Sequence, residues 1–515
     1  MKPFLYLLCL AGPSCLWSQP VPNTPFSLTG VIESFTLDAP TPLSSAKIRV
    51  HGINVQIPAN LIVQMPGTYM TPADLFREPQ IIAPTATSGR IVDLSKTVFR
   101  AFSCLSLADI NDPAKACSIR GSIEATVIGN IIGGNYIAGL VWISHNALAE
   151  ASGVVDSVSS NPPELTVHSH AGDLVRVRIN DPEGRFSIAH SDDVRFKSDD
   201  ENPTIHAESG YPMCISRGAL DPLCPGANRP AANPNRFTIG AIRQSADYPA
   251  CPACDPRVAA PIIAGDQIVY SGTLMADAAG TFISAHTIEV NVAIYTAPCS
   301  SNCTGVPVYV FIEGSRAGTG GVPFPNLSQD VIGRNLPPPA IATHVKVEGM
   351  TTDPTRPVRV FAVDVEPTTG DESRRLLATI PAAAAPFGRF RLVLPPANHL
   401  PAAREILAVP AGVNEATGIS STVVGRVLVS GLYQAPVGEF VFAESNLPGQ
   451  RPIPMNFESL CFLLDGSGPL ATRPWSGAPP ASIPTVGRLA PFPFSGQTAK
   501  DLDAFGNALC RTPLP

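Results

Sequence analysis

The sequence predicts a mainly β protein, made of several small antiparallel β-barrel or sandwich modules in tandem with a disulfide-clipped insertion. The 515 residues include 55 prolines, about twice the average share, and a proline inside a helix costs about 3 kcal/mol. Hydrophobic residues make up 44% of the chain, and many alternate with polar residues over short runs bounded by Gly, Pro or Asp. Such period-2 alternation is typical of strands.

The N-terminal segment, MKPFLYLLCLAGPSCLWSQ, has the pattern of a signal peptide over residues 1–18. Lys2 precedes an apolar run that is too short to span a bilayer, and small and polar residues follow it. We expect cleavage after Ser18, with a lipoprotein cysteine at Cys15 or a retained anchor as alternatives. The sequence therefore predicts a protein that is secreted, periplasmic or on the cell surface, with no integral membrane segment in the mature chain.

A glycine recurs inside strand-like segments along the whole chain. Glycine within a strand often marks a bulge or a tight bend, as in small barrels. Because the spacing is irregular, we do not expect a solenoid with a fixed period. The glycines are Gly30 in LTGVIESFTL, Gly121 in IRGSIEATVI, Gly153 in ASGVVDSV, Gly272 in IVYSGTLMAD, Gly349 in VKVEGMTTD and Gly431 in VLVSGLYQ.

Composition divides the chain into successive segments, and helices are expected only at Pro72–Arg77 and Ala499–Cys510. The expected division is a β module at 19–117, β structure ending in an acidic loop at 118–195, a Cys- and Pro-rich insertion at 196–262, β modules at 263–335 and 336–445, and a Pro-rich tail at 446–515.

Some segments resemble known proteins. LTGVIESFTL and KIRVHGINVQIPANLIV resemble the OB-like β modules of uncharacterised secreted bacterial and fungal proteins. The segments GRFSIA, DDENPTIHAESGYPMC, YSGTL and ISAHTIEVNVAIYTAP look like part of the same kind of family. The resemblance implies secretion and β architecture, and it implies no activity.

The cysteines after the N-terminal segment occur as neighbours in the sequence. In an oxidising compartment such neighbours are candidates for disulfides that clip loops. For the CxxC at Cys251 and Cys254 there are two alternatives to a structural disulfide. It could be a redox-active pair, or it could form a zinc site together with Cys214 and Cys224. The simplest pairing is Cys104 with Cys117, Cys214 with Cys224, Cys251 with Cys254, Cys299 with Cys303, and Cys461 with Cys510.

An acidic stretch from Asn180 to Cys214 offers the first candidate site. Calcium binds about 6–8 oxygens, so this stretch could hold calcium; paired carboxylates could instead catalyse glycoside hydrolysis. A solvated loop is the structural alternative, because NDPEG is a good turn sequence and basic residues lie among the acids. The candidate ligands are Asp192, Asp193, Asp199, Asp200 and Glu201.

The TVHSH segment offers a second candidate metal site. His168 and His170 would face the same side of a strand, and His190 or His206 could supply a third ligand. The structural alternative is an exposed strand face.

The remaining patterns limit the classes of function. The net charge of -7 and the absence of a basic patch disfavour nucleic acid as a partner. There is no G-x-S-x-G elbow, and we assign no catalytic residue. We expect no cofactor other than calcium. The sequence favours a binding or structural role outside the cytoplasm, with a polysaccharide, a surface protein or a small apolar molecule as partner; an extracellular hydrolase with its site within 168–214 is the alternative.

Overall fold

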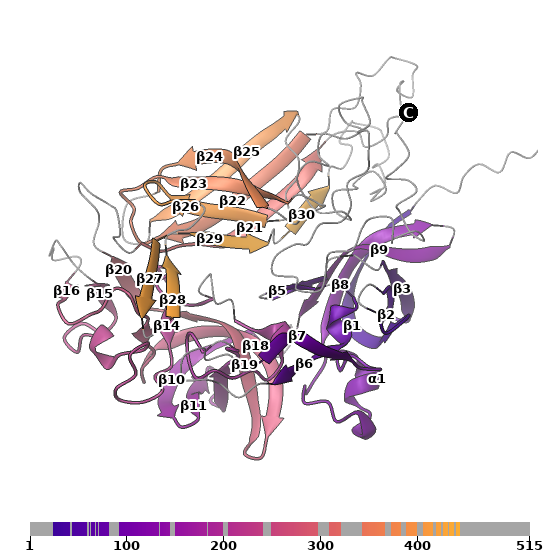
Figure 1. Ribbon diagram of the computed structural model, residues 1–515, viewed down its shortest axis with the longest axis horizontal. Helices are drawn as coiled ribbons and strands as arrows, with labels where there is room; N and C mark the ends of the chain where they lie inside the picture. Colours follow the sequence, from indigo (N-terminus) through magenta and orange to yellow (C-terminus); the bar gives the residue numbers. More distant parts are fainter. Residues whose placement is uncertain are drawn as a thin grey trace, which may run out of the picture.

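The fold is mainly β and consists of two closed barrels followed by a two-sheet sandwich (Figure 1). The computed structural model describes residues 24–41, 44–58, 61, 63–66, 68–70, 72–81, 92–132, 134–144, 150–182, 184–198, 204–239, 249–296, 308–320, 342–365, 372–382, 388–398, 405–415, 419–423, 426–430, 432–436 and 439–442. Among these residues no helix is both long and apolar enough to cross a membrane.

Barrel 1 has its long first strand at the centre of the sheet. One half of β1 pairs with β2 and the other half with β8, both antiparallel, while β3 closes the barrel by pairing in parallel with β9. His51 and Gly52 connect β2 to β3 with φ values of 50° and 74°, as a two-residue hairpin turn requires. The strands are β1 (Thr24–Leu37), β2 (Ala46–Val50), β3 (Ile53–Ile57), β8 (Glu124–Ile132) and β9 (Asn135–Ser144).

The segment between β3 and β8 contains short elements outside the barrel. A strand pair extends the sheet beyond β9, and a separate hairpin follows. The helix expected at Pro72–Arg77 is a single 3-10 turn. The expected helix Ala499–Cys510 lies outside the described residues. The elements are β4 (Val63–Met65), β5 (Thr68–Met70), η1 (Asp74–Phe76), β6 (Arg77–Ile81), β7 (Val92–Phe99), α1 (Leu107–Ile110) and η2 (Pro113–Lys115).

Barrel 2 repeats the connectivity of barrel 1. Its first strand lies between the second and the fourth, and its third strand pairs in parallel with its fifth. The strands are β10 (Glu150–Ser160), β11 (Pro163–Ser169), β12 (Leu174–Ile179), β18 (Gln267–Asp277) and β19 (Gly280–Val290).

A long connection at 180–266 joins the third and fourth strands of barrel 2. It packs on the barrel, and β13 adds to the far end of β19 in parallel. It contains η3 (Val194–Phe196), β13 (Ile205–Ala207), β14 (Met213–Cys214), η4 (Gly226–Asn228), β15 (Arg236–Ile239), β16 (Ala250–Cys251) and β17 (Ala260–Pro261), and β15 pairs with β20 (Ala293–Thr296) after the barrel.

The sandwich consists of two four-stranded sheets with a hairpin inserted between β26 and β29. Alternating side chains such as Val347, Val360 and Ile406 are fully buried in its core. One sheet has β21 (Val310–Gly320), β22 (Ala342–Thr351), β25 (Arg389–Asn398) and β30 (Glu439–Phe442); the other has β23 (Val358–Val365), β24 (Glu372–Ile380), β26 (Glu405–Pro410) and β29 (Tyr433–Pro436); the hairpin is β27 (Ile419–Val423) and β28 (Arg426–Ser430).

Each barrel combines segments that are far apart in the sequence. Strands of barrel 1 lie on both sides of the expected boundary between residues 117 and 118. Barrel 2 joins strands from the expected segments 118–195 and 263–335, and most of the expected insertion 196–262 lies between them. The described part of the segment 336–445 contributes to the sandwich, together with β21.

The hydrophobic core of barrel 1 extends into the barrel 2 half of the protein, which also has a core of its own. Phe196, Met275 and Phe282 belong to barrel 2 and its connection, yet they pack with the buried side chains of barrel 1. Ile119 forms a β-bridge with Met275, and the backbone N–H of Arg120 donates to the Leu274 carbonyl at 2.8 Å. Exposing this surface would cost hydrophobic burial energy in both barrels.

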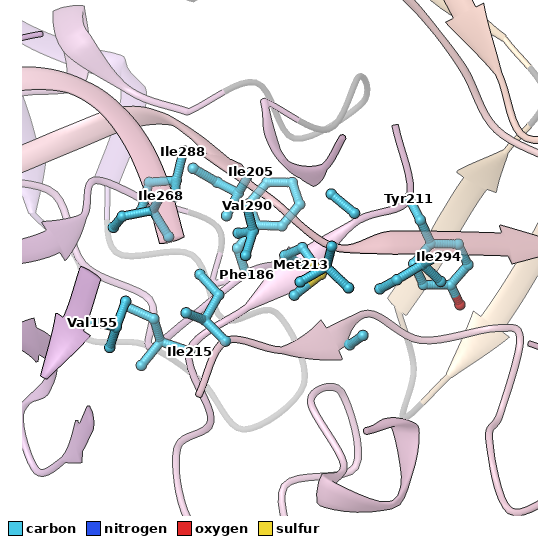
Figure 2. Close-up of a cluster of buried hydrophobic side chains, with 14 of the residues drawn as sticks. Val155, Phe186, Ile205, Tyr211, Met213, Ile215, Ile268, Ile288, Val290 and Ile294 are labelled. Atoms are coloured by element: carbon cyan, nitrogen blue, oxygen red, sulfur yellow. The ribbon is translucent and has the colours of Figure 1, made fainter. Parts of the chain in front are cut away.

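The core of barrel 2 includes side chains from the long connection. Figure 2 shows Phe186 and Met213 beside the strand residue Val290, and Tyr211 beside Ile294. All of these side chains are at most 2% exposed. The connection is therefore part of the folded body and not a loop attached to its surface.

The glycines inside strands allow backbones to approach closely. A Cβ at Gly153 would collide with the His168 carbonyl, and one at Gly272 would collide with the Ser284 carbonyl. The pairing of β18 with β19 shifts register between Ser271 and Gly272, which is the bulge that the sequence pattern indicated. Gly431 lies outside the described residues.

The substitution Gly349→Ala tests this steric constraint. Its Cβ would overlap the Phe311 carbonyl and the Phe390 ring, so we expect the free energy of unfolding to fall by about 2 kcal/mol. Gly314→Ala is the control, because Gly314 lies on the neighbouring strand with nothing within 4 Å of its Cβ position. Chemical denaturation measures both, and equal effects would contradict the explanation.

Candidate functional site

The acidic stretch begins with a loop that is held in place by its own side chains. The buried Asn180 amide donates to the carbonyls of Asp193 at 2.7 Å and Phe196 at 2.8 Å. The Asp181 carboxylate accepts from the backbone N–H groups of Phe186 at 2.7 Å and Ser187 at 2.9 Å. Hydrogen bonds from backbone N–H groups to an ionised carboxylate are strong. Asp181 therefore holds this part of the acidic stretch in one conformation.

A histidine, an aspartate and a serine meet where this loop packs against β19. His190 Nε2 lies 2.7 Å from Asp192 Oδ1, and the Ser284 hydroxyl donates to Asp192 Oδ2 at 2.5 Å. The side chain of Asp192 is 9% exposed and that of His190 is 41% exposed. The carboxylate therefore orients an imidazole that is open to solvent.

The order of these three groups limits their chemistry. In a nucleophilic triad the imidazole lies between serine and carboxylate and takes the hydroxyl proton. Here Asp192 lies between the other two, so Ser284 is not activated by His190. An imidazole oriented by a carboxylate is instead suited to acid–base transfer involving a bound water or substrate.

Asp193 has a different task from its neighbour Asp192. It caps η3 by accepting from the Arg195 N–H at 3.0 Å, and it pairs with the Arg195 guanidinium at 2.6 Å. Arg195 Nη1 donates to the carbonyls of Leu75 at 2.8 Å and Ser103 at 2.7 Å, both in the barrel 1 half of the protein. Asp193 and Arg195 thus form a clamp between the barrels.

The expected calcium ligands divide accordingly. Asp192 and Asp193 carry out the roles given above, while Asp199, Asp200 and Glu201 lie outside the described residues. Within the described ranges no three or more His, Cys, Asp or Glu side chains are grouped so that they could hold a metal ion.

The two histidines of TVHSH lie at the end of β11. His168 is in the strand and exposed, and His170 is exposed in the turn that follows. His190 lies in the separate site with Asp192, and His206 is buried at the contact with the sandwich. The structure gives His168 strand neighbours that are aliphatic.

His168 belongs to an apolar surface that we name the barrel 2 patch, consisting of Val154, His168, Leu174 and Val269. His168 lies directly opposite Val154 on β10 and Leu174 on β12, and Val269 is one step further on β18, opposite Ser152. Leu174 is 61% exposed, and Val154 and Val269 are each 42% exposed. Exposed apolar patches of this kind often mark interaction sites.

Beside the patch, a network of four charged side chains covers the same face of barrel 2. Arg176 pairs with Glu164 at 2.8 Å and with Asp277 at 2.9 Å, and Arg178 pairs with the same two carboxylates, each at 2.6 Å. Hydrogen bonds from Arg176, followed by those from Arg178, hold the pKa of Asp277 well below its usual range. The network thus links β11, β12 and β18, three of the four strands that carry the patch.

The network was not identified in the sequence, although a signal for it exists. Arg176 and Arg178 are two residues apart on one strand, so they face the same side. Their acidic partner Asp277 is about a hundred positions away, and no local pattern reveals such a neighbour.

Three of the predicted disulfides are present. They join Cys104 to Cys117, Cys214 to Cys224, and Cys251 to Cys254. Because both pairs of the insertion are oxidised, their sulfurs are not thiolates available to zinc. Cys299, Cys303, Cys461 and Cys510 lie outside the described residues.

Replacing Arg195 by methionine tests the clamp. The change removes one partner of a largely buried ion pair and leaves two carbonyls without their donor, so we expect the free energy of unfolding to fall by about 3 kcal/mol. The control is Arg257→Met, which breaks an exposed pair with Asp255 and should leave the denaturation midpoint unchanged. A similar midpoint for both variants would contradict the clamp.

No protein-family model matches the chain, and neither a curated protein nor a solved structure matches it. The function is therefore inferred from the chemistry of the described residues.

Proposed function

We propose that the chain is a binding protein with a structural role outside the cytoplasm, and that barrel 2 presents its patch to the partner. The single observation that carries the proposal is the in-register exposure of Leu174, His168 and Val154 across three strands. The signal-like N-terminus and the three disulfides support an extracellular or periplasmic setting, because disulfides persist in oxidising compartments.

We further propose that both barrels are OB-like. The support is their connectivity, a five-stranded barrel in which the third and fifth strands pair in parallel. OB folds bind ligands on the face of their second and third strands. In barrel 2 these strands are β11 and β12, which carry His168 and Leu174 of the patch.

The chemistry of the patch favours a protein surface as the partner. Apart from His168 its side chains are aliphatic, and among the described residues no Phe, Tyr or Trp is found with the large exposed apolar residues. Aliphatic surfaces rimmed by charged groups are typical of protein contacts. The charged network around Arg176 lies beside the patch and forms such a rim.

The test compares Leu174→Asp with Leu220→Asp in the full mature chain. Purified protein is incubated with the cell envelope fraction of the producing organism, and bound protein is quantified by titration. A charge in the patch should weaken binding by about tenfold or more, whereas Leu220, which is 94% exposed, should tolerate the same change. Equal binding by both variants, or no binding by the unmodified chain, would contradict the proposal.

The second candidate function is an extracellular hydrolase, and the His190–Asp192 contact is what favours it. In that case His190 would act as a general base toward water, oriented by Asp192. A panel of ester, peptide and glycoside substrates would show turnover by the unmodified chain and a loss of about 100-fold or more in His190→Ala. His168→Ala is the matched control. Turnover that survives in His190→Ala would exclude His190 as the base, and no turnover by the unmodified chain would contradict the hydrolase function.

A further inference from the structure

The connection of barrel 2 makes an aromatic contact with the first strand of the sandwich. The rings of His206 and Phe311 have centroids 4.7 Å apart, and those of Tyr211 and Tyr309 lie 4.9 Å apart. Gly210, with a φ of 83°, lies against Phe311 where a side chain would collide with the ring. We name this contact the sandwich junction, formed by residues 205–211 and 308–313.

Hydrogen bonds next to the rings order the two sides of the junction, and one of them crosses it. The Thr352 backbone N–H donates to the Tyr309 carbonyl at 2.9 Å, and the Tyr309 N–H donates to the Thr352 hydroxyl at 2.9 Å. The hydroxyls of Thr296 and Thr352 are 3.1 Å apart. The Ser209 hydroxyl donates to the Ile294 carbonyl. Of these bonds, the contact between the Thr296 and Thr352 hydroxyls is the one that joins the barrel 2 side to the sandwich, so loosening the junction exposes these two hydroxyls together with the rings.

His206 is the titratable group at the centre of the junction. It is 8% exposed, and its Nδ1 lies 2.7 Å from the Ala207 carbonyl. Because a carbonyl only accepts, Nδ1 carries the proton in the neutral ring. Protonation would add a second N–H and a full charge within this contact, and burial accordingly lowers the pKa of His206.

Carboxylates from three elements surround the histidine. Glu289 lies opposite His206 on β19, Glu208 follows on the turn, and Glu313 follows the contact on β21. Arg389 of β25 is the cation among them, with its guanidinium 3.6 Å from the Glu313 carboxylate. Burial, followed by the charge of Glu289, raises the pKa of Glu208, and burial raises the pKa of Glu289.

We propose that the sandwich junction is a pH-sensitive contact that mild acid loosens, releasing the sandwich from barrel 2. The proposal concerns regulation and does not rest on the binding role of the patch. Its basis is the placement of a buried, neutral imidazole against the ring of a second module.

The direction of the effect follows from proton binding. Above pH 6.5, the ordinary pKa of histidine, both the docked and the released states hold His206 neutral and the junction is at full strength. Below that pH the released state binds a proton that the docked state does not, so docking weakens until the lowered pKa is reached. Glu208 and Glu289 act in the opposite direction, because their raised pKa values favour docking as the pH falls toward 4.5.

The experiment is hydrogen exchange of the full mature chain at pH 7.5 and 5.5, corrected for chemical exchange, in peptides 204–212 and 308–313. One proton linked to opening should raise the opening constant by about tenfold between the two pH values. His206→Phe keeps an aromatic ring and should abolish this rise. His206→Gln provides a second neutral variant, and His168→Phe, on the exposed patch, should behave as the unmodified chain.

Either of two results would overturn the proposal. One is an opening constant of the unmodified chain that is the same at both pH values. The other is a tenfold rise that persists in a folded His206 variant, which would assign the proton to another group. A rise lost in His206→Phe or His206→Gln and kept in His168→Phe supports it.

Discussion

The parallel pairing of β12 with β19 is the constraint on which the rest of the structure depends. Val177 lies opposite Ile283, and Ile179 lies opposite Ala285. Because β18 is antiparallel to β19, β18 makes the return that a parallel pair needs. The connection at 180–266 leads from the end of β12 to the start of β18. It carries the histidine oriented by Asp192, the clamp at Arg195 and the ring of His206, so the closure of one barrel positions every candidate site on that connection.

The same connection explains why the three modules are not independent folding units. Toward barrel 1 it contributes Phe196 to a shared core and Arg195 to two backbone carbonyls. Toward the sandwich it contributes the His206 imidazole, which is tilted against the Phe311 ring, and Tyr211. The first contact combines apolar packing with the Arg195–Asp193 pair, whereas the second places a buried histidine against an aromatic ring. We therefore expect barrel 1 and barrel 2 to unfold as one cooperative unit. The coupling of the sandwich to this unit is expected to depend on pH.

Local sequence patterns predicted much of the secondary structure and few of the contacts in the candidate site. Alternation and strand glycines such as Gly272 predicted β structure because pleat and steric contact are local properties. For the same reason, neighbouring cysteines predicted the three disulfides that the described residues contain. Barrel closure depends on pairing Val55 with Tyr136, which no local pattern encodes. Likewise Asp192 was a candidate from its acidic surroundings, but its partner Ser284 is 92 residues away.

Native-state hydrogen exchange tests the shared core most directly. If Phe196, Met275 and Phe282 join the two barrels, the slowest amides of β8 and β18 will exchange through one opening reaction with one free energy and one denaturant dependence. Two different opening free energies, one for each barrel, would show that the barrels unfold independently and would contradict the account.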